Sequence, residues 1–538
     1  MMPKTEREDQ SRSDPFTNFL EPLRSGGFKR FPGRGMLKLL LSEIADSASD
    51  PRGLHTPLIS AISLQPELTE FLKSIDVRGD LEIIETCQKL IFLESRGIDI
   101  VHLILRRQIN TDPAMEHALA SLRRAYLRSV VRQPEAIAPR LFPSMITIAL
   151  QCFNNEYVFC ETSEEVEICR EIAAGQWGDD CGVSSLVLKV IAYGMYRPIS
   201  QLALSEQQIH SLKQQGEDVQ ELIDRQIREN ALERELAAHI SSFGRIQDEV
   251  SIKVRRQYEE APYPRWIDLA ERKPRQFAAY IGKKFPFLRE GLPMGSVDCL
   301  VAGCGTGQHS LYVASKFSAA TVTAVDISRR SLAYGMRQAS RYGFGNIEFL
   351  HGDLLEIKAL KRDFDLIESV GVLHHLEDPL SGFKALTEVL RPGGFMKIAV
   401  YRRSFRNQLM PAKEFVRAHM KSYAATDLRG VRHELIADKS VNLCCTGSSD
   451  FYYLSGFRDL LCHVQETSFT PSEIKVMLRK LDLEFLGMEY SDRAIKTAFQ
   501  AAYPDKSRAH DLDVYEEFEA GRAEQMPSLL EFWVRKKR

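Results

Sequence analysis

The feature that most restricts the fold of this chain is a run of three alternating glycines behind a short apolar segment. Residues 297–302 are mostly apolar, and Gly303, Gly305 and Gly307 follow them directly. A short apolar run is typical of a buried strand, and the glycines permit a tight turn into a helix that begins near Gln308. The backbone N–H groups of such a turn come close enough to a ligand to bind it.

An acidic residue stands at the end of the next expected strand. That strand covers residues 321–325, and Asp326 follows it, twenty-three positions after Gly303. In dinucleotide-binding folds a carboxylate at about this spacing accepts hydrogen bonds from ribose hydroxyls. The crevice between the two strands is therefore predicted to hold a nucleoside.

The glycine spacing excludes two common nucleotide-binding loops. A dinucleotide fingerprint counted from Gly303 needs a glycine at position 308, where Gln308 stands. A P-loop needs a lysine after its glycines, and this run has none. The observed G-x-G-x-G spacing resembles motif I of the class I S-adenosylmethionine-dependent methyltransferases.

Later segments follow in the order that this family shows. After Asp326 come a helix, a third strand with an acidic turn, a fourth strand that leads into a histidine pair, and a Pro-Gly-Gly turn into a fifth strand. These segments are 331–342, 346–354, 364–376 and 391–401, and two further strands are expected at 483–490 and 529–535. Strands and helices that alternate at these lengths predict a parallel sheet with helices on both faces.

The resemblance implies a Rossmann-like α/β fold. The predicted architecture is a seven-stranded methyltransferase sheet, mostly parallel with one antiparallel edge strand, preceded by a large all-α domain. The expected divisions are a flexible tail at 1–32, a bundle-like or repeat-like helical domain with a connecting helix at 33–256, a Pro/aromatic strap with a lead-in helix at 257–294, and the methyltransferase domain at 295–538. Within that last domain we expect an insert at 402–470 and a helical excursion at 492–527.

Two prolines surround a tyrosine directly before the expected methyltransferase domain. Pro262 and Pro264 cannot lie in a helix interior or a central strand, so residues 257–266 are predicted to form a rigid extended segment. Here the chain resembles a bacterial family in which a helical, often tetratricopeptide-bearing, region leads into a methyltransferase domain through a Tyr-Pro-Arg-Trp segment. Ala261 stands where that family usually has asparagine, and the resemblance covers about residues 145–538.

The resemblance implies S-adenosyl-L-methionine as the cofactor. It places Asp326 on the ribose hydroxyls and Asp353 beside the adenine. Val301 stands where many class I enzymes carry an acidic residue, so the methionine ammonium group must be bound by another group or by water. The expected cofactor-binding residues are Gly303, Cys304, Gly305, Gly307, Asp326, Ile327, Asp353, Leu354 and Ser369.

Methyl transfer depends on the alignment and desolvation of the reactants, so a methyltransferase does not require a catalytic residue that its sequence would reveal. His375 lies just beyond the carboxyl end of the fourth strand, where it could take a proton from a nucleophilic oxygen or nitrogen. A packing role is the alternative for His375 and for its neighbour His374. Candidate substrate contacts combine aromatic and charged side chains in the strap and the insert, with packing again as the alternative. They are Tyr258, Tyr263, Arg265, Trp266, Tyr452, Arg458, His463 and Glu466.

The composition is that of an ordinary globular protein. Hydrophobic residues make up 44% of the chain, and 71 lysines and arginines against 73 acidic residues give a net charge of −2. Without a basic field, the chain is not expected to bind nucleic acid or an anionic membrane. It shows no signal-peptide pattern and no apolar run of about eighteen residues, so we expect a cytoplasmic protein without membrane spans. The ten cysteines lack disulfide or zinc spacing, and no metal is expected.

Three functions are open on these grounds. The first is a methyltransferase that acts on an oxygen or nitrogen nucleophile of a small molecule, a peptide or a protein. Its helical domain would bind a substrate or protein partner, or form a homodimer. The second is a helical interaction or scaffold protein with a non-catalytic methyltransferase-like domain, which Val301 and Ala261 favour. The third is an RNA methyltransferase, against which the balanced charge argues.

Overall fold

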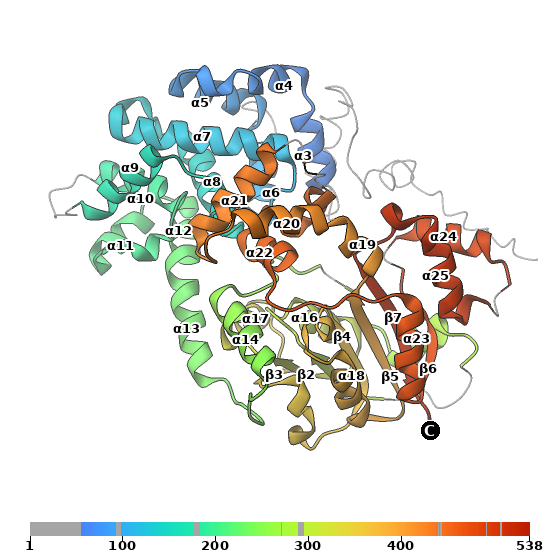
Figure 1. Cartoon of the computed structure of the whole chain (residues 1–538). Coiled ribbons are helices and arrows are strands. Elements are labelled where there is room, and N and C mark those ends of the chain that lie inside the picture. The colour runs from blue at the N-terminus through green and yellow to red at the C-terminus, as the bar shows by residue number, and fades with distance from the viewer. Residues whose placement is uncertain are drawn as a thin grey trace, which may run out of the picture. The chain divides into compact units, whose positions relative to one another are not determined.

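The computed structural model describes residues 55–92, 98–175, 183–270, 272–288, 295–438, 441, 444–490, 492–505 and 508–538. The flexible tail expected at 1–32 lies outside these residues. The chain divides into two compact units (Figure 1). The first holds the described residues up to Asn154 together with Glu161–Leu222, and the second holds Asn155–Cys160 and Ile223–Arg538.

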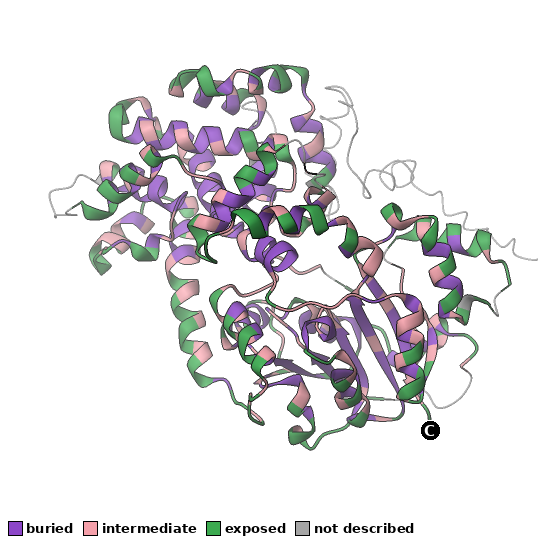
Figure 2. Ribbon diagram, in the orientation of Figure 1, coloured by how far each residue is buried: buried purple, intermediate pink, exposed green. Residues whose placement is uncertain are grey.

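The first unit is built of helices. They are α3 (His55–Ser63), α4 (Pro66–Leu72), α5 (Asp80–Leu90), α6 (Ile98–Arg107), α7 (Pro113–Arg132), α8 (Phe142–Asn154), α9 (Ser163–Ala174), α10 (Val183–Gly194), α11 (Glu206–Lys213) and α12 (Glu217–Ile223). Figure 2 shows that these helices turn their buried residues toward one another. Among them lies a buried polar contact, in which Arg123 of α7 is 3.5 Å from Glu165 of α9 and Tyr196 donates to Glu165 at 2.6 Å.

Two helices expected in the helical domain belong to the second unit. After a π-helical turn at Asp224–Arg228 come α13 (Glu229–His239) and α14 (Glu249–Glu260). Arg337 of α17 (Arg329–Arg341) pairs with Glu229 at 3.3 Å and with Glu233 at 2.8 Å, which holds α13 against the helices of the sheet. The boundary between the units therefore falls near residue 222 and not near residue 256.

A seven-stranded sheet forms the centre of the second unit. Its strands are β1 (Val297–Ala302), β2 (Ala320–Asp326), β3 (Ile347–His351), β4 (Phe364–Val370), β5 (Leu390–Tyr401), β6 (Leu483–Met488) and β7 (Leu529–Lys536). The order is β3-β2-β1-β4-β5-β7-β6, and β7 runs antiparallel to both β5 and β6. The expected fold, a mostly parallel sheet with antiparallel pairing at one end, is confirmed.

The fifth strand begins earlier than the sequence predicted. The Pro-Gly-Gly turn interrupts β5 and does not precede it, because β4 pairs Phe364 with Leu390 and then Leu366 with Phe395. The residues between Leu390 and Phe395 form an irregularity in the ladder, and Gly393 in it has a φ of +76°. Glycine adopts this left-handed conformation without steric cost.

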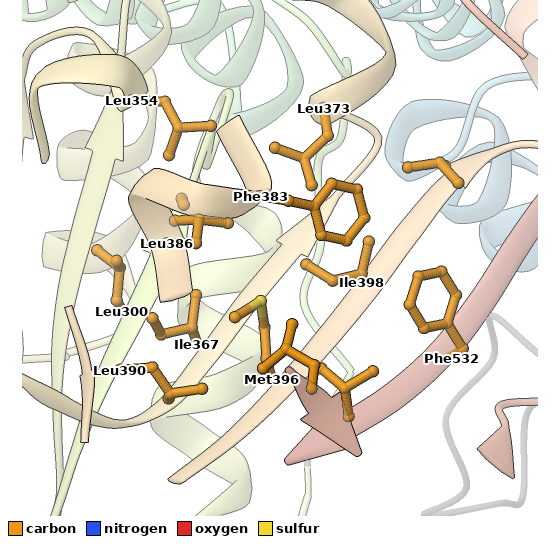
Figure 3. Packing of buried hydrophobic residues seen from close by; sticks show 14 of the residues in the cluster. Leu300, Leu354, Ile367, Leu373, Phe383, Leu386, Leu390, Met396, Ile398 and Phe532 are labelled. Carbon is orange, nitrogen blue, oxygen red and sulfur yellow. The ribbon is translucent and has the colours of Figure 1, made fainter. Parts of the chain in front are cut away.

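Helices cover both faces of the sheet. Successive residues of β1 point to opposite faces, so Leu300 packs in one core and Val301 in the other. Figure 3 shows the first core, in which α18 contributes Phe383 and Leu386. The covering helices are α18 (Pro379–Glu388) and α23 (Pro471–Lys480) on this face, with α15 (Phe277–Lys284), α16 (Gln308–Lys316) and α17 on the other.

Two helical segments interrupt the second half of the sheet. Between β5 and α23 lie α19 (Arg403–Gln408), α20 (Met410–His419), α21 (Ala425–Ala437) and α22 (Leu454–Cys462). Between β6 and β7 lie α24 (Arg493–Ala502) and α25 (Leu512–Ala520), which share a small aromatic core. In the described part of the chain, no helix is both long and apolar enough to cross a membrane.

Candidate cofactor and active site

A cavity of about 320 Å³ opens at the carboxyl ends of the parallel strands. Open α/β sheets bind their ligands at this edge. Because β7 is antiparallel, Leu529 at its start pairs with Tyr401 at the end of β5, and Leu529 therefore reaches the same edge. The described residues that line the cavity are Ser251, Val254, Tyr258, Tyr263, Pro264, Val301, Gly303, Cys304, Gly305, Gln308, His309, Val325, Asp326, Ile327, Gly352, Asp353, Leu354, Val370, Gly371, Val372, His375, Leu376 and Leu529.

The glycine turn after β1 fits a ligand because it carries no side chains. Gly303 and Gly305 have φ values of +73° and +52°. A Cβ on Gly303 would lie 2.4 Å from Val372, and one on Gly305 would lie 2.5 Å from the carbonyl oxygen of Tyr263. Only glycine leaves room for the chain to close over the cavity at these two positions.

Gly307 has a different role from the one predicted, because it does not line the cavity. It caps α16 with a φ of +83°, and a Cβ there would lie 2.8 Å from the Cα of Gly335 in α17. Gly307 therefore permits two helices to approach each other.

Asp326 ends β2 and lies on the cavity wall with 8% of its surface exposed. Its Oδ2 accepts from the N–H of Gly305 at 2.7 Å, and its Oδ1 accepts from the N–H of Ser328 at 2.8 Å. Burial raises its pKa to about 6, against the opposing effect of these two N–H groups. Each carboxylate oxygen can accept a further hydrogen bond, which suits ribose hydroxyls.

Two further residues that were expected to bind the cofactor, Asp353 and Ser369, have separate roles. Asp353 lines the cavity and caps the short helix η7 (Leu354–Leu360), where its Oδ1 accepts from the N–H of Leu355 at 3.0 Å. Ser369 does not line the cavity. Its hydroxyl donates to the carbonyl of Ala302 at 3.1 Å and so ties β4 to β1.

His375 lies in the short helix η8 (Leu373–His375) and lines the cavity. Its Nδ1 is 2.8 Å from the carbonyl oxygen of Gln465. A carbonyl only accepts, so Nδ1 carries the proton and Nε2 keeps its lone pair. Burial lowers the pKa of His375, although the charge of Asp459 opposes this effect. The ring is therefore held neutral with one defined basic nitrogen.

His374 packs away from the cavity. Its ring stacks on Tyr401 with centroids 3.6 Å apart, and its Nδ1 accepts from the N–H of Tyr401 at 3.1 Å. These contacts fit the packing role that was the alternative for this residue.

His375, Asp459 and His463 form a cluster that sequence patterns did not reveal, with one ligand atom of each within 4.8 Å of the others. The rings of His375 and His463 are stacked, with centroids 3.6 Å apart and planes at 21°. The lone pair of an imidazole nitrogen lies in the plane of its ring, and two nearly parallel planes do not meet at one nearby ion. Tyr258 also occupies the cluster, because its hydroxyl lies 2.8 Å from Asp459 and 3.1 Å from His463. We therefore interpret Tyr258, Asp459 and His463 as a hydrogen-bonded wall behind His375.

The strap contributes two tyrosines to the cavity. Tyr258 lies in α14 and not in an extended segment, because that helix continues to Glu260 and Pro262 breaks it only afterwards. Ser251 and Val254 precede Tyr258 on the same face of α14 and line the cavity with it. Tyr263 follows in the extended part, with its hydroxyl 3.2 Å from Asp450.

The rest of the strap fastens it to the glycine turn. Trp266 donates to the carbonyl of Thr306 at 3.1 Å, and the hydroxyl of Thr306 donates to the carbonyl of Pro264 at 2.5 Å. Arg265 stacks on Tyr334, with its guanidinium 5.2 Å from the ring centre. Arg265 and Trp266 therefore do not line the cavity, and Trp266 has the packing role.

The four predicted contacts from the insert also do not line the cavity. Tyr452 donates to the carbonyl of Thr446 at 3.0 Å, and Arg458 binds Glu260 at 3.0 Å. His463 lies behind His375, and Glu466 pairs with Arg406 and Lys413. The insert thus supports the wall of the site.

Several lining residues escaped prediction. His309 directly follows the helix start at Gln308, and this position just behind the glycine turn was a signal that could have identified it. Ser251, Val254 and Leu529 carry no such signal, because they come from elements remote in sequence from the glycine turn.

Comparison with known proteins assigns the central part of this architecture. Residues 299–394 match a methyltransferase domain. The cofactor of such a domain is S-adenosyl-L-methionine, which donates the methyl group. The glycine turn and the carboxylates of Asp326 and Asp353 fit this cofactor. Gly303, Cys304, Gly305, Asp326, Ile327, Asp353 and Leu354 are the predicted cofactor residues that line the cavity.

Relatives extend the similarity over part of the chain. An uncharacterized protein of Synechococcus sp. is 31% identical over 210 residues, which are 37% of this chain and 50% of the relative. An uncharacterized methyltransferase of Mycobacterium tuberculosis is 30% identical over 130 residues, which are 24% of this chain and 64% of the relative. The chain thus spans between half and two thirds of these relatives. The structure of PKMT2 from Rickettsia typhi in complex with AdoHcy aligns with a TM-score of 0.36 and 16% identity, over 49% of this chain and 55% of that one.

Proposed function

We propose that the protein is an S-adenosylmethionine-dependent methyltransferase that acts on an oxygen or nitrogen nucleophile, with His375 as the base. The observation that carries this proposal is the position of His375 on the wall of a cavity whose glycine turn and carboxylates suit the cofactor, with its Nδ1 bound to the carbonyl of Gln465 so that Nε2 is the basic nitrogen. The cofactor supplies an electrophilic methyl group. The chain supplies alignment, exclusion of water and an acceptor for the proton of the nucleophile.

The role of His375 follows from its surroundings. The carbonyl of Gln465 fixes the tautomer, and burial lowers the pKa so that the ring is neutral before the reaction. Once Nε2 has taken the proton, the nearby carboxylate of Asp459 stabilises the charged ring. A base placed in this way contributes about 10²- to 10⁴-fold in rate.

The acceptor substrate is a small molecule, a peptide or a protein whose nucleophile reaches the cavity beside His375. Tyr258 and Tyr263 line this cavity and offer aromatic surface to it. Their hydroxyls are engaged by Asp459 and Asp450, so the rings are held in fixed orientations. We assign these two tyrosines to the substrate side of the site.

The test combines binding and turnover. Calorimetric titration of S-adenosylhomocysteine into the full chain should show binding that Asp326→Ala weakens at least about tenfold, because the ribose loses a charged hydrogen-bond acceptor. His375→Asn should keep this affinity within about twofold and lower methyl-label transfer into cell extract at least about 100-fold. His419→Asn, at an exposed position of α20, is the matched histidine control.

Two results would contradict the proposal in different ways. A folded wild-type protein that does not bind S-adenosylhomocysteine would exclude the cofactor site as assigned. Normal label transfer by His375→Asn would leave the cofactor site standing and remove the base.

A further inference from the structure

A carboxylate lies beside the position where the motif I acid is missing. Val301 occupies that position, and it pairs in register with Glu368 on the neighbouring strand β4. Side chains of residues paired in register project from the same face of a sheet. Glu368 therefore brings a negative group next to Val301 from a different strand.

The carboxyl group of Glu368 is buried and only half satisfied. The residue is 0% exposed, Oε2 lies 2.7 Å from Nε2 of His309, and Oε1 has no hydrogen-bond partner among the described residues. Burial alone would raise its pKa, but His309, with Lys316 and Lys397, lowers the pKa to about 2. Glu368 is thus ionised, and the charges of Lys316 and Lys397 offset part of the cost of burying its carboxylate.

His309 links this carboxylate to the cavity. It is the second residue of α16, it lines the cavity, and 26% of its side chain is exposed. An ionised carboxylate only accepts, so Nε2 of His309 carries a proton, and Nδ1 is the ring nitrogen left to accept a hydrogen bond. The ring stacks on Tyr312 with centroids 5.6 Å apart, which limits its rotation.

The two ends of the cavity differ in chemistry. Asp326 and Asp353 lie at the end formed by β2 and β3, which suits the nucleoside. His309 and Val301 lie at the end formed by β1 and α16, and none of the described residues that line the cavity is a lysine or arginine. A hydrogen-bond acceptor backed by a buried negative charge suits a cationic group at this end.

We propose that His309, held by Glu368, binds the ammonium group of the methionine part of the cofactor, in place of the acid that Val301 replaces. This inference rests on the assignment of the cavity to S-adenosylmethionine. His309 is the contacting residue, and Glu368 is a positioning residue that acts through it.

Two ligands isolate this contact in a binding experiment. S-adenosylhomocysteine carries the amino-acid group, and 5′-methylthioadenosine has the same nucleoside and sulfur without it. In calorimetric titrations of the full chain, Glu368→Gln should weaken S-adenosylhomocysteine about tenfold and change 5′-methylthioadenosine less than about twofold. His309→Leu should do the same, and the double variant should lose no more than either single variant, since both act on one contact.

Ser369→Ala is the matched control. Ser369 lies next to Glu368 on β4, is fully buried and makes a hydrogen bond, but it does not line the cavity. We expect this variant to bind both ligands like the wild type. If Glu368→Gln unfolds, as circular dichroism would show, His309→Leu at its partly exposed position carries the comparison.

The outcomes separate this inference from the proposed function. Loss of S-adenosylhomocysteine affinity alone supports the ammonium contact. Equal loss of both ligands, or loss of neither, in a folded variant overturns it while the cofactor site stands. A folded wild type that binds neither ligand overturns the cofactor assignment and this inference with it.

Discussion

At the scale of single residues, Asp326 and His375 show how burial adjusts two titratable groups in opposite directions. Burial disfavours the charged form of each, so the pKa of Asp326 rises to about 6 and the pKa of His375 falls. Near neutral pH each group still has the form that its proposed role needs, because the carboxyl group of Asp326 is mostly ionised and the imidazole of His375 is neutral. The roles belong to different parts of the reaction, which are cofactor binding and proton removal.

The raised pKa of Asp326 predicts a pH dependence of cofactor binding. The affinity for S-adenosylhomocysteine should be constant above about pH 7 and fall as the pH drops through 6, because the protonated carboxyl loses acceptor capacity for ribose. We expect binding about tenfold weaker at pH 5 than at pH 7.5, measured by calorimetry.

A second buried acid supplies the control for this measurement. The pKa of Asp450 is also raised to about 6 by burial, but Asp450 does not line the cavity. Asp450→Asn should keep the pH dependence and Asp326→Asn should abolish it. The reverse pattern would show that another group governs binding.

At the scale of elements, close contacts with two helices and the strap hold the glycine turn in place. Gly307 at the start of α16 meets Gly335 of α17, and Trp266 of the strap packs in a small core with Leu311 and Tyr334 from the same two helices. The glycine turn is thus fixed on one side by the strap and on the other by α17. This arrangement holds the backbone N–H groups near the cavity in place before a ligand binds.

Substitution of Gly307 separates backbone strain from steric contact. Gly307→Ala places a side chain at a φ of +83° and a Cβ 2.8 Å from the Cα of Gly335. Gly343→Ala has a similar φ of +71° but meets no atom within 4 Å. We expect Gly343→Ala to lower the free energy of unfolding by about 1 kcal/mol and Gly307→Ala by about 2–4 kcal/mol. Urea denaturation measures both, and equal losses would contradict the close approach of the helices.

At the scale of the whole molecule, the site gathers segments that are far apart in the chain. Tyr258 contacts Asp459 across 201 positions, and Leu529 reaches the cavity from the last strand. The lining comes from α14, the strap, the turns after β1, β2, β3 and β4, and the start of β7, all within the second unit. Ligand binding should therefore change amide hydrogen exchange in several segments that are far apart in the sequence.

Amide hydrogen exchange tests this convergence. Saturating S-adenosylhomocysteine should slow exchange in peptides that cover residues 251–264, 303–309, 325–328, 352–355 and 370–376. Peptides from α7, none of whose residues lines the cavity, serve as the internal reference. Protection confined to residues 303–309 would contradict a cofactor site built from all these segments.

Local patterns in the sequence determined the order of strands and helices, the glycine turn, and the placement of Asp326 and Asp353 at strand ends. Such features depend on hydrophobic periodicity and turn chemistry within a few residues. The tertiary structure alone decided that Ser251 and Leu529 line the cavity and that Ser369 and Arg458 do not. The face to which a side chain points depends on strand register, and the partner of a polar residue depends on packing between segments hundreds of positions apart. Neither the direction of a side chain nor its polar partner can be predicted from a local sequence pattern.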